Sequence, residues 1–318
     1  MNPYHSRISY NPLSTDVGLV LKPGMMEIDR EGLLKKIRKF VKDWDCLIEQ
    51  EIGWLKYNNI DGVVSDIVPW IFTSTRHAEI KSVFISNFTW VEIYKELFEE
   101  KVYERYLESY RQADYAFLYP LAGDIGEHFQ TSKTVGMSCR SFNAEKVSDI
   151  KARYKRPIIY MSVGRSVDLV TEIDVGELPY QFIYTEGINL KGENAELLPA
   201  DTDNTHDYIK AAEHVITKAG WGTVAEAICA QKPMLVLRRD EVAEDRVTLQ
   251  KLMDLGVALP LTKEELNVAR LCELLKQLEN RSKNYKSLSD KYTNCSDQIA
   301  EQLLKVLYGG AFESGKEQ

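Results

Sequence analysis

The segment VITKAGWGTVAEAICAQKPMLVL (215–237) combines glycines, a cation and a carboxylate where an apolar strand is expected to pass into a helix. Gly220 and Gly222 lack a Cβ, so the backbone here can approach a ligand closely. A helix N-terminus presents unpaired N–H groups that attract an anion, and Lys218 adds a positive charge just before the turn. We interpret the turn as a seat for a diphosphate, with Glu226 accepting hydrogen bonds from ribose hydroxyls.

Thr223 and Glu226 have the spacing of a capping box, which predicts that the helix begins at Thr223. The same spacing occurs at Thr262 and Glu265, where no pair of glycines precedes it. A plain helix start is therefore the alternative to a ligand site.

The stretch TKAGWGT (217–223), followed by Glu226, KPML (232–235) and AED (243–245), resembles the donor-sugar signature of the GT-B glycosyltransferases. These include the UDP-glycosyltransferases and the lipid-linked N-acetylglucosaminyltransferase of peptidoglycan synthesis. The similarity extends to VVSDIVPW and SVFISNFTW in the first half. It implies an inverting, metal-independent transferase that needs no cofactor. Such an enzyme moves a sugar from a nucleoside diphosphate, UDP by family default, to a hydroxyl acceptor.

The resemblance also implies roles for individual residues. Thr223 and the turn backbone would hold the diphosphate and Glu226 the ribose, while Glu244 and Asp245 would meet hydroxyls of the donor sugar. A second glycine turn would face the phosphates from the other side. The complete donor-site prediction is Gly164, Arg165, Ser166, Lys218, Gly220, Trp221, Gly222, Thr223, Glu226, Glu244 and Asp245.

The sequence departs from the family pattern in several places. Lys218 stands where the family has a histidine. Asp245 stands where the family has a glutamine, so the family pattern does not select one donor sugar. The segment 233–243 is longer than in the plant relatives and carries charges that either touch the donor or form a surface loop. LLPA (197–200) stands where plant relatives stack the nucleotide base on a tryptophan.

Transfer to a hydroxyl requires a base. Asp66 is our candidate because it ends an expected parallel strand, where ligands of such sheets bind; capping the next helix is the alternative. Asn87 and Trp90 are candidates for the acceptor side. Trp90 is spaced four residues from Tyr94, so helix packing is the main alternative for its ring.

Strands without polar alternation alternate with amphipathic helices, which predicts an α/β fold of two Rossmann-like, doubly wound parallel-sheet domains. We place an acceptor-side domain at 1–150 and a nucleotide-sugar domain at 151–318, with the last helix packing back on the first domain. The expected strands are 61–66, 81–87, 115–120, 157–164, 181–185, 214–218 and 233–237. The expected helices are 29–60, 68–80, 88–114, 204–212, 223–231, 243–254, 263–278 and 284–307.

The opening of the chain differs most from the GT-B pattern, which starts with a strand, a glycine turn and a helix. No such unit is found before Gly18, and RISY (7–10) resembles a later strand. We expect that the unit is missing or supplied by a partner chain or a second copy, leaving a sheet edge exposed. The alternative functions are a non-catalytic nucleotide-sugar-binding subunit, or a nucleotide-sugar hydrolase or epimerase.

Composition and charge disfavour some classes of protein and favour a cellular location. The 318 residues carry a net charge of −8, which disfavours nucleic-acid binding. No apolar run is long enough to span a bilayer, and no secretory signal is evident. Five scattered cysteines indicate reduced thiols and a cytoplasmic protein. The expected acceptor is a small molecule, a glycan or a lipid. The apolar stretch 67–72 either touches a membrane surface or is buried in the core.

Overall fold

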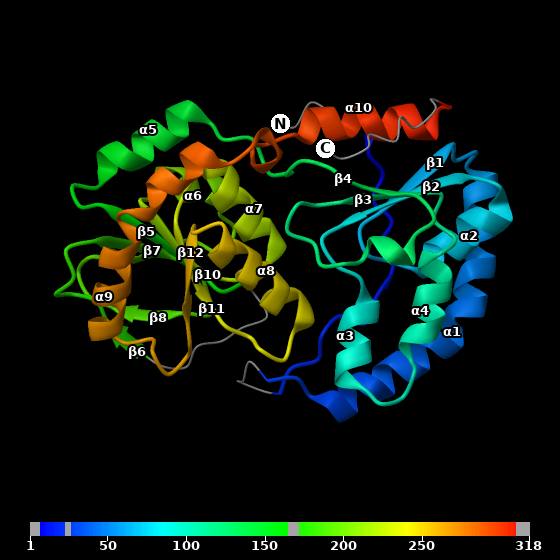
Figure 1. The fold of residues 1–318 in the computed structure, drawn as a ribbon, viewed down its shortest axis with the longest axis horizontal. Coiled ribbons are helices and arrows are strands. Elements are labelled where there is room, and N and C mark those ends of the chain that lie inside the picture. The colour runs from blue at the N-terminus through cyan, green and yellow to red at the C-terminus, as the bar shows by residue number, and fades with distance from the viewer. Residues whose placement is uncertain (1–6, 23–26, 165–171, 310–318) are drawn as a thin grey trace.

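The computed structural model describes residues 7–22, 27–164 and 172–309. Two parallel sheets with their helices lie side by side, and we call them the N-terminal and C-terminal lobes (Figure 1). Every paired strand in both sheets runs parallel to its neighbour. The fold class expected from the sequence is therefore confirmed.

The N-terminal lobe has a four-stranded sheet in the order β1-β2-β3-β4. Its strands are β1 (Gly62–Ser65), β2 (Lys81–Ser86), β3 (Tyr115–Leu118) and β4 (Ser132–Thr134). Its helices are α1 (Arg30–Tyr57), α2 (Trp70–Ala78), α3 (Trp90–Leu97) and α4 (Tyr103–Tyr110), with a short 3-10 turn, η2 (Gly126–His128). Among the described strands, β1 pairs only with β2, so its outer edge is open and Val64 is exposed.

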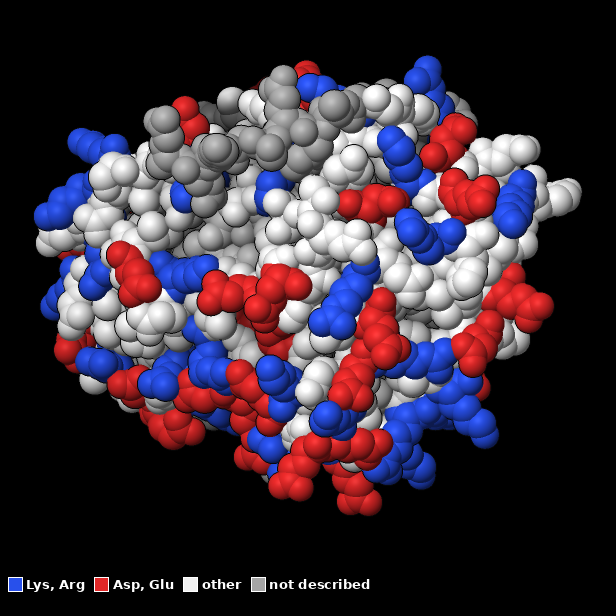
Figure 2. Space-filling view, turned by 45° about the vertical axis from the view of Figure 1, so that its right-hand side comes forward, with Lys and Arg blue, Asp and Glu red and all other residues white. Residues whose placement is uncertain are grey.

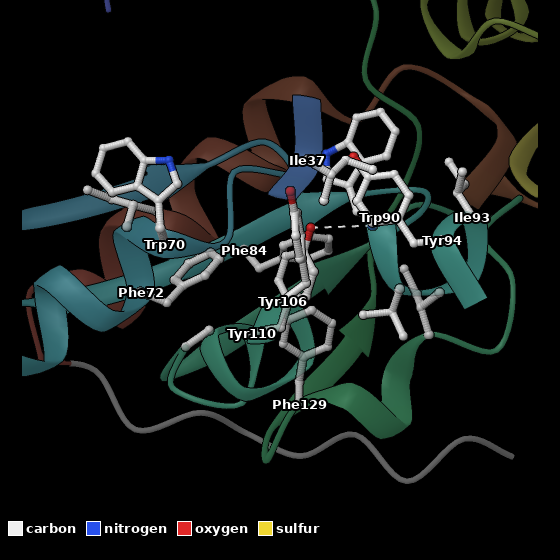
Figure 3. Close-up of a cluster of buried hydrophobic side chains, with 14 of the residues drawn as sticks. Ile37, Trp70, Phe72, Phe84, Trp90, Ile93, Tyr94, Tyr106, Tyr110 and Phe129 are labelled. Atoms are coloured by element: carbon white, nitrogen blue, oxygen red, sulfur yellow. Dashed lines mark hydrogen bonds between the residues drawn. The ribbon is translucent and has the colours of Figure 1, made fainter. Parts of the chain in front are cut away.

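Alternate residues of β2 point to opposite faces of the sheet. Phe84 joins the core under helices α1–α4, and aromatic rings from α2, α3 and α4 surround it (Figure 3). Val83 and Ile85 face the other way and pack against α10 (Ser296–Leu307), the last described helix. The chain therefore returns from the C-terminal lobe to complete the first one.

The C-terminal lobe has a six-stranded sheet in the order β12-β11-β10-β5-β7-β9. Its strands are β5 (Ile158–Ser162), β7 (Gln181–Tyr184), β9 (Ala195–Leu197), β10 (His214–Lys218), β11 (Met234–Leu237) and β12 (Ala258–Leu261). Strands β6 (Glu172–Asp174) and β8 (Asn189–Lys191) form a separate pair. The helices are α5 (Ala144–Arg153), α6 (Thr205–Ala211), α7 (Trp221–Ala230), α8 (Ala243–Asp254) and α9 (Val268–Leu278).

Three expectations about elements are wrong. Residues 7–10 form no strand. The single helix expected over 88–114 is two helices, because the backbone is extended at Phe98. The helix expected over 284–307 is two 3-10 turns, η3 (Arg281–Ser287) and η4 (Asp290–Tyr292), followed by α10.

Surface charge is mixed. On the face drawn in Figure 2, acidic and basic side chains lie interspersed. The apolar stretch 67–72 lies in the core of the N-terminal lobe, where Trp70 and Phe72 are buried. Core burial therefore explains its composition. None of the helices in the described ranges combines the length and apolarity that a bilayer crossing requires.

Candidate functional site

A cavity of about 890 Å³ opens at the carboxyl ends of the C-terminal lobe's strands, a volume suited to a small ligand. Its floor is the start of α7, represented by Gly222, Thr223 and Glu226. One wall is the segment Leu198–Ala200, and another is Gly164 after β5. Sequence reasoning had singled out each of these features. It gave no signal for Ser138–Arg140, a further part of the lining that comes from the segment between the lobes.

The helix behind the glycine turn begins earlier than expected. α7 starts at Trp221 with Gly220 as its N-cap, and no side chain caps it. The capping box predicted at Thr223 is therefore wrong, because Thr223 already lies within the first turn. The consequence is favourable for a ligand, since the first N–H groups of the helix are left to face the cavity.

Two glycines make room for Lys218. A Cβ on Gly164 would lie 3.0 Å from Lys218 Cε, and one on Gly220 would lie 3.3 Å from the same atom. Gly164 also has φ +75°, which side chains rarely adopt. Burial lowers the pKa of Lys218, with Arg239 acting in the same direction and Asp245 and Glu244 opposing it. The ammonium thus lies in a partly desolvated position beside the turn.

Glu226 is held by a residue that sequence reasoning missed. Arg140 Nε donates to Glu226 Oε1 at 2.6 Å, and Arg140 Nη2 donates to Glu226 Oε2 at 3.2 Å. The same guanidinium donates to the Asp203 carbonyl and to Thr205 Oγ1, each at 2.8 Å. Because Glu226 is only 6% exposed, this pairing fixes its direction. A role of Glu226 toward ribose hydroxyls stays a prediction, and Arg140 is a partner that the sequence did not indicate.

Tyr160 completes the inner wall. Burial raises its pKa to about 12, and Ser162 and Thr205 hydrogen-bond to it. It is a neutral hydrogen-bonding group near the Arg140–Glu226 pair. No motif marked it in the sequence, because it is one apolar-looking residue in a buried strand.

Comparisons with known proteins show what the chain is similar to. Residues 173–303 match the model of the glycosyltransferase family 28 C-terminal domain. An L-arabinokinase from Arabidopsis thaliana is 27% identical over 266 residues, which is 75% of this chain and 24% of that protein. The chain therefore spans about a quarter of the length of that relative.

Three solved structures are similar in fold. The calicheamicin glycosyltransferase CalG4 superposes with a TM-score of 0.60 at 15% identity, covering 87% of this chain and 84% of CalG4. Arabidopsis thaliana UGT89C1 in complex with UDP gives 0.55 at 13% identity, with 86% and 76% covered. A Listeria monocytogenes protein described as a UDP-N-acetylglucosamine 2-epimerase gives 0.55 at 14% identity, with 84% and 79% covered.

The chain has the GT-B fold. The resemblance drawn from the glycine turn is thereby confirmed at the level of the fold. In this GT-B chain the matched region begins at β6 and ends within α10, so it includes the glycine turn and Glu226.

Asp245 and Glu244, the two α8 residues predicted for the donor site, have different surroundings in this GT-B chain. Asp245 is 2% exposed and is bound by Arg239, whose Nη2 lies 2.8 Å from Asp245 Oδ1. A donor-sugar role for Asp245 would require that pair to open, and it stays a prediction. Glu244 accepts from Asn87 Nδ2 at 3.2 Å. Residues predicted for the donor and acceptor sides therefore meet at the boundary between the lobes.

Burial raises the pKa of Glu244 to about 7. Asp245 raises it further, while the hydrogen bond from Asn87 and the charges of Lys218 and Arg239 lower it. A carboxyl that titrates near neutrality beside the turn has the property expected of an acid–base group.

Asp66 lies at the end of β1, facing the end of the neighbouring strand. Asp66 is exposed to solvent. Partial desolvation of its carboxyl by the surrounding protein raises its pKa, and a hydrogen bond with Ser86 opposes the shift. The helix that follows has no side-chain cap, so the capping alternative does not explain Asp66. Its charge acts on Tyr119, whose ring stacks on Trp221 at 4.7 Å. Asp66 therefore faces the region where the N-terminal lobe meets the glycine turn.

Trp90 is 6% exposed and stacks on Tyr94 with ring centroids 5.2 Å apart. Figure 3 shows both rings inside the aromatic core. Packing accounts for its spacing, and contact with an acceptor stays a prediction. Arg165 and Ser166 lie outside the described residues. In the described ranges, no group of three or more His, Cys, Asp or Glu side chains is placed to hold a metal ion.

Proposed function

We propose that this protein is an inverting, metal-independent glycosyltransferase of the cytoplasm that takes its sugar from a UDP-linked donor. The cavity at the start of α7 is the observation that carries the proposal. It joins exposed helix N–H groups with a fixed carboxylate, and these groups suit a diphosphate and a ribose respectively. The similarity of the fold to a UDP complex supports uracil as the base of the nucleotide.

Stabilisation of the leaving diphosphate would come from the protein rather than from a metal. The N-terminus of α7 and the Lys218 ammonium both lie at the turn. Preorganised donors of this kind stabilise charge that develops in a transition state.

Asp66 is the proposed base. It lies in the N-terminal lobe, opposite the turn, and its raised pKa favours proton acceptance from a hydroxyl. An acceptor between Asp66 and the turn would also touch Tyr119 and Trp221, which stack across the boundary between the lobes. The acceptor itself is a small molecule, a glycan or a lipid bearing a hydroxyl.

A second candidate is hydrolysis or epimerisation of the nucleotide sugar. The similarity to the Listeria protein described as an epimerase favours it, as does Glu244, a carboxyl titrating near pH 7 beside the turn. The third candidate is a binding subunit that catalyses no reaction. It requires that the cavity bind nucleotide and that no sugar be released.

Calorimetric titration of UDP, dTDP, GDP and ADP tests the donor site. We expect UDP to bind and Glu226→Ala to weaken binding about tenfold or more, since a tenfold change corresponds to about 1.4 kcal/mol. Glu264→Ala is the control, because Glu264 is an exposed carboxylate in the turn after β12. Failure of all four nucleotides to bind the wild type would refute the proposal.

Release of UDP from UDP-sugars then separates the candidates. Release that requires an acceptor and is lost in Asp66→Asn, with UDP affinity unchanged, supports transfer with Asp66 as base. Release without any acceptor supports the hydrolase or epimerase. Tight UDP binding with no release across a broad acceptor panel supports the binding subunit.

A further inference from the structure

A second, smaller cavity lies at the boundary between the lobes, and it shares no lining residue with the 890 Å³ cavity. Helices α3 and α8 face each other there (Figure 1), and the loop 121–125 closes a third side. We call this cavity the boundary pocket. Its volume is about 100 Å³. One water molecule takes about 30 Å³, so the pocket has room for one short chemical group.

Most of the wall of the boundary pocket is apolar. Ile93 of α3 and Leu121 and Ile125 of the loop are buried side chains that line it, and Val247 of α8 lies between them and solvent. An apolar wall gains free energy by covering a hydrocarbon group. The wall therefore suits the aliphatic part of a ligand.

Thr248 places a polar group without a partner in this wall. The residue is 1% exposed, and its Oγ1 makes no hydrogen bond with any residue in the described ranges. A hydroxyl within a helix can donate to the carbonyl one turn earlier, but Thr248 does not. A buried hydroxyl left unpaired is costly, so an occupant that hydrogen-bonds to Thr248 would recover free energy.

The charged groups that line the pocket, among the residues that the structure describes, are all carboxylates: Glu92, Glu96, Asp124 and Glu244. Two of them have basic partners outside the pocket. Glu92 is hydrogen-bonded to His128, and Glu96 accepts from Arg246 Nη2 at 2.7 Å. The charge of these two is therefore already balanced.

Asp124 and Glu244 have no basic side chain in contact. Asp124 makes no hydrogen bond or ion pair with another described residue, and Glu244 accepts only from the neutral amide of Asn87. The charges of Lys218 and Arg239 act on Glu244, but neither residue lines the pocket. A cation inside the pocket would thus meet two unbalanced carboxylates.

We propose that the boundary pocket binds a primary ammonium group carried on a short aliphatic stem. An ammonium has three N–H donors and no acceptor. Glu244 and Thr248 are four residues apart on α8 and so lie on one face of the helix, where they accept two of these donors. Asp124 accepts the third from the loop. The stem packs on Ile93 and Val247.

Other occupants of the boundary pocket fit its wall less well. A neutral alcohol would pair with Thr248 but would leave both carboxylates without a counter-charge. A bare metal ion would leave the apolar wall uncovered, and the described carboxylates do not gather into a group of three that could hold one.

The site does not depend on the proposed sugar transfer, because it requires no nucleotide and lies outside the 890 Å³ cavity. A chain that binds no UDP could therefore still bind the ammonium. The UDP titrations and the titrations below thus fail independently.

The test uses n-butylammonium chloride as the probe and n-butanol as the neutral control of the same length. Saturation-transfer NMR titrations are made at constant ionic strength and about pH 8, where an alkylammonium, like a lysine side chain, stays protonated. Glu244, whose pKa burial raises to about 7, is then mostly ionised. We expect n-butylammonium to bind saturably in the millimolar range and n-butanol to bind about tenfold more weakly.

Three substitutions separate charge from hydrogen bonding. Glu244→Gln should weaken n-butylammonium about tenfold and leave n-butanol nearly unchanged. Thr248→Val should weaken both probes, because each loses a hydrogen bond. Glu264→Gln removes the same charge from an exposed carboxylate in the turn after β12, and it should change neither affinity.

Gly123→Ala tests whether the probes occupy the pocket itself. A Cβ on Gly123 would lie 3.8 Å from Val247 Cγ1, which is an ordinary contact, so the fold should tolerate the methyl group. Because both residues line the pocket, the methyl group would take up part of its volume. We expect it to weaken both probes severalfold.

Equal affinity of the wild type for the two probes would overturn the proposal, as would the absence of saturable binding in the millimolar range. Binding of n-butylammonium that neither Glu244→Gln nor Gly123→Ala weakens would place the cation elsewhere and would also refute it. Circular dichroism shows which variants are folded. If one of the α8 variants does not fold, Gly123→Ala and the two probes on the wild type still decide.

Discussion

At the scale of single residues, two glycines that line the cavity have different roles. One is required by the fold, and the other leaves space for a ligand. A Cβ on Gly222 meets nothing within 4 Å, and Gly222 lies in the helix α7. A Cβ on Gly164 would press on the Lys218 side chain, at a positive φ. The two glycines therefore have different uses although both line the cavity.

Alanine at these positions should give opposite results. Gly222→Ala should keep or raise stability by up to about 1 kcal/mol, because alanine favours helix, and should weaken UDP binding about tenfold by filling the seat. Gly164→Ala should lower stability by about 1–2 kcal/mol, since left-handed backbone is strained with a Cβ. Urea unfolding and calorimetry measure both. Equal loss of stability in the two variants would contradict this division.

The raised pKa of Glu244 predicts that the stability of the fold depends on pH. Its pKa is raised from 4.5 to about 7 in the folded protein, so its protonated form favours folding. This contribution is fully present below pH 4.5 and is lost as the pH rises through 7. Asn87, Lys218, Arg239 and Asp245 face the carboxyl and are included in that shift.

Glu244→Gln should remove this dependence, because glutamine stays neutral and can still accept from Asn87. Between pH 5 and 8 the variant should gain about 1–3 kcal/mol relative to wild type. Urea unfolding at several pH values measures the difference. A constant difference across this range would show that Glu244 titrates as it does in the unfolded chain.

The sequence predicted the cavity residues of the glycine turn and Gly164, and it missed residues from remote segments that belong to no motif. Gly222, Thr223 and Glu226 lie within a few residues of one another, so their spacing was visible. Arg140 reaches Glu226 from a remote segment, and no local pattern carries that information. The capping box failed because two glycines let the helix begin one residue after Gly220.

At the scale of elements, α10 completes the sheet of the N-terminal lobe. Ile299 is 4% exposed and packs with Val83 and Ile85 on the second face of the sheet. Leu304 lies on the same helix but is 56% exposed. Lys81 Nζ also donates to the Val306 carbonyl at 3.2 Å, which holds the end of the helix over β2.

Truncating these two side chains tests the role of α10. Ile299→Ala should cost about 2–4 kcal/mol, the usual effect of removing a buried aliphatic side chain. Leu304→Ala should change stability by less than about 0.5 kcal/mol. Chemical denaturation of both variants is the measurement. Similar small losses for the pair would mean that α10 is not part of the core.

Most of the larger elements were predicted, whereas the shortest strands were missed. α8 has the bounds expected from the sequence, Ala243–Asp254. Strands β4, β6, β8 and β9 have three residues each, too few for alternation or an apolar run to show in the sequence. The break between α3 and α4 carries neither glycine nor proline, and tertiary packing of Phe98 in the core replaces a local signal.

At the scale of the whole molecule, the lobes share a core as well as a boundary. Val242 and Ala243 belong to the cluster that fills the N-terminal lobe. Arg246 bridges to Glu96, with its Nη2 2.7 Å from Glu96 Oε1, and Tyr119 stacks on Trp221. Loss of either lobe would therefore expose apolar surface on the other.

We expect the lobes to unfold together. Differential scanning calorimetry should give one transition, with a calorimetric enthalpy close to the van't Hoff enthalpy. Arg246→Ala is a useful comparison, because an exposed ion pair contributes only about 0–1 kcal/mol and should leave the single transition intact. Two resolved transitions in the wild type would contradict the shared core.

The return of α10 to the first sheet has a consequence for synthesis on the ribosome. β3 ends at Leu118, but the helix that covers Val83, Ile85 and Phe117 begins only at Ser296. At about 5–20 residues per second, the ribosome needs roughly 10–40 s to make the intervening chain. Throughout that interval the nascent sheet presents an uncovered apolar face. A chaperone that shields such surfaces would therefore act on this face, between the emergence of β3 and that of α10.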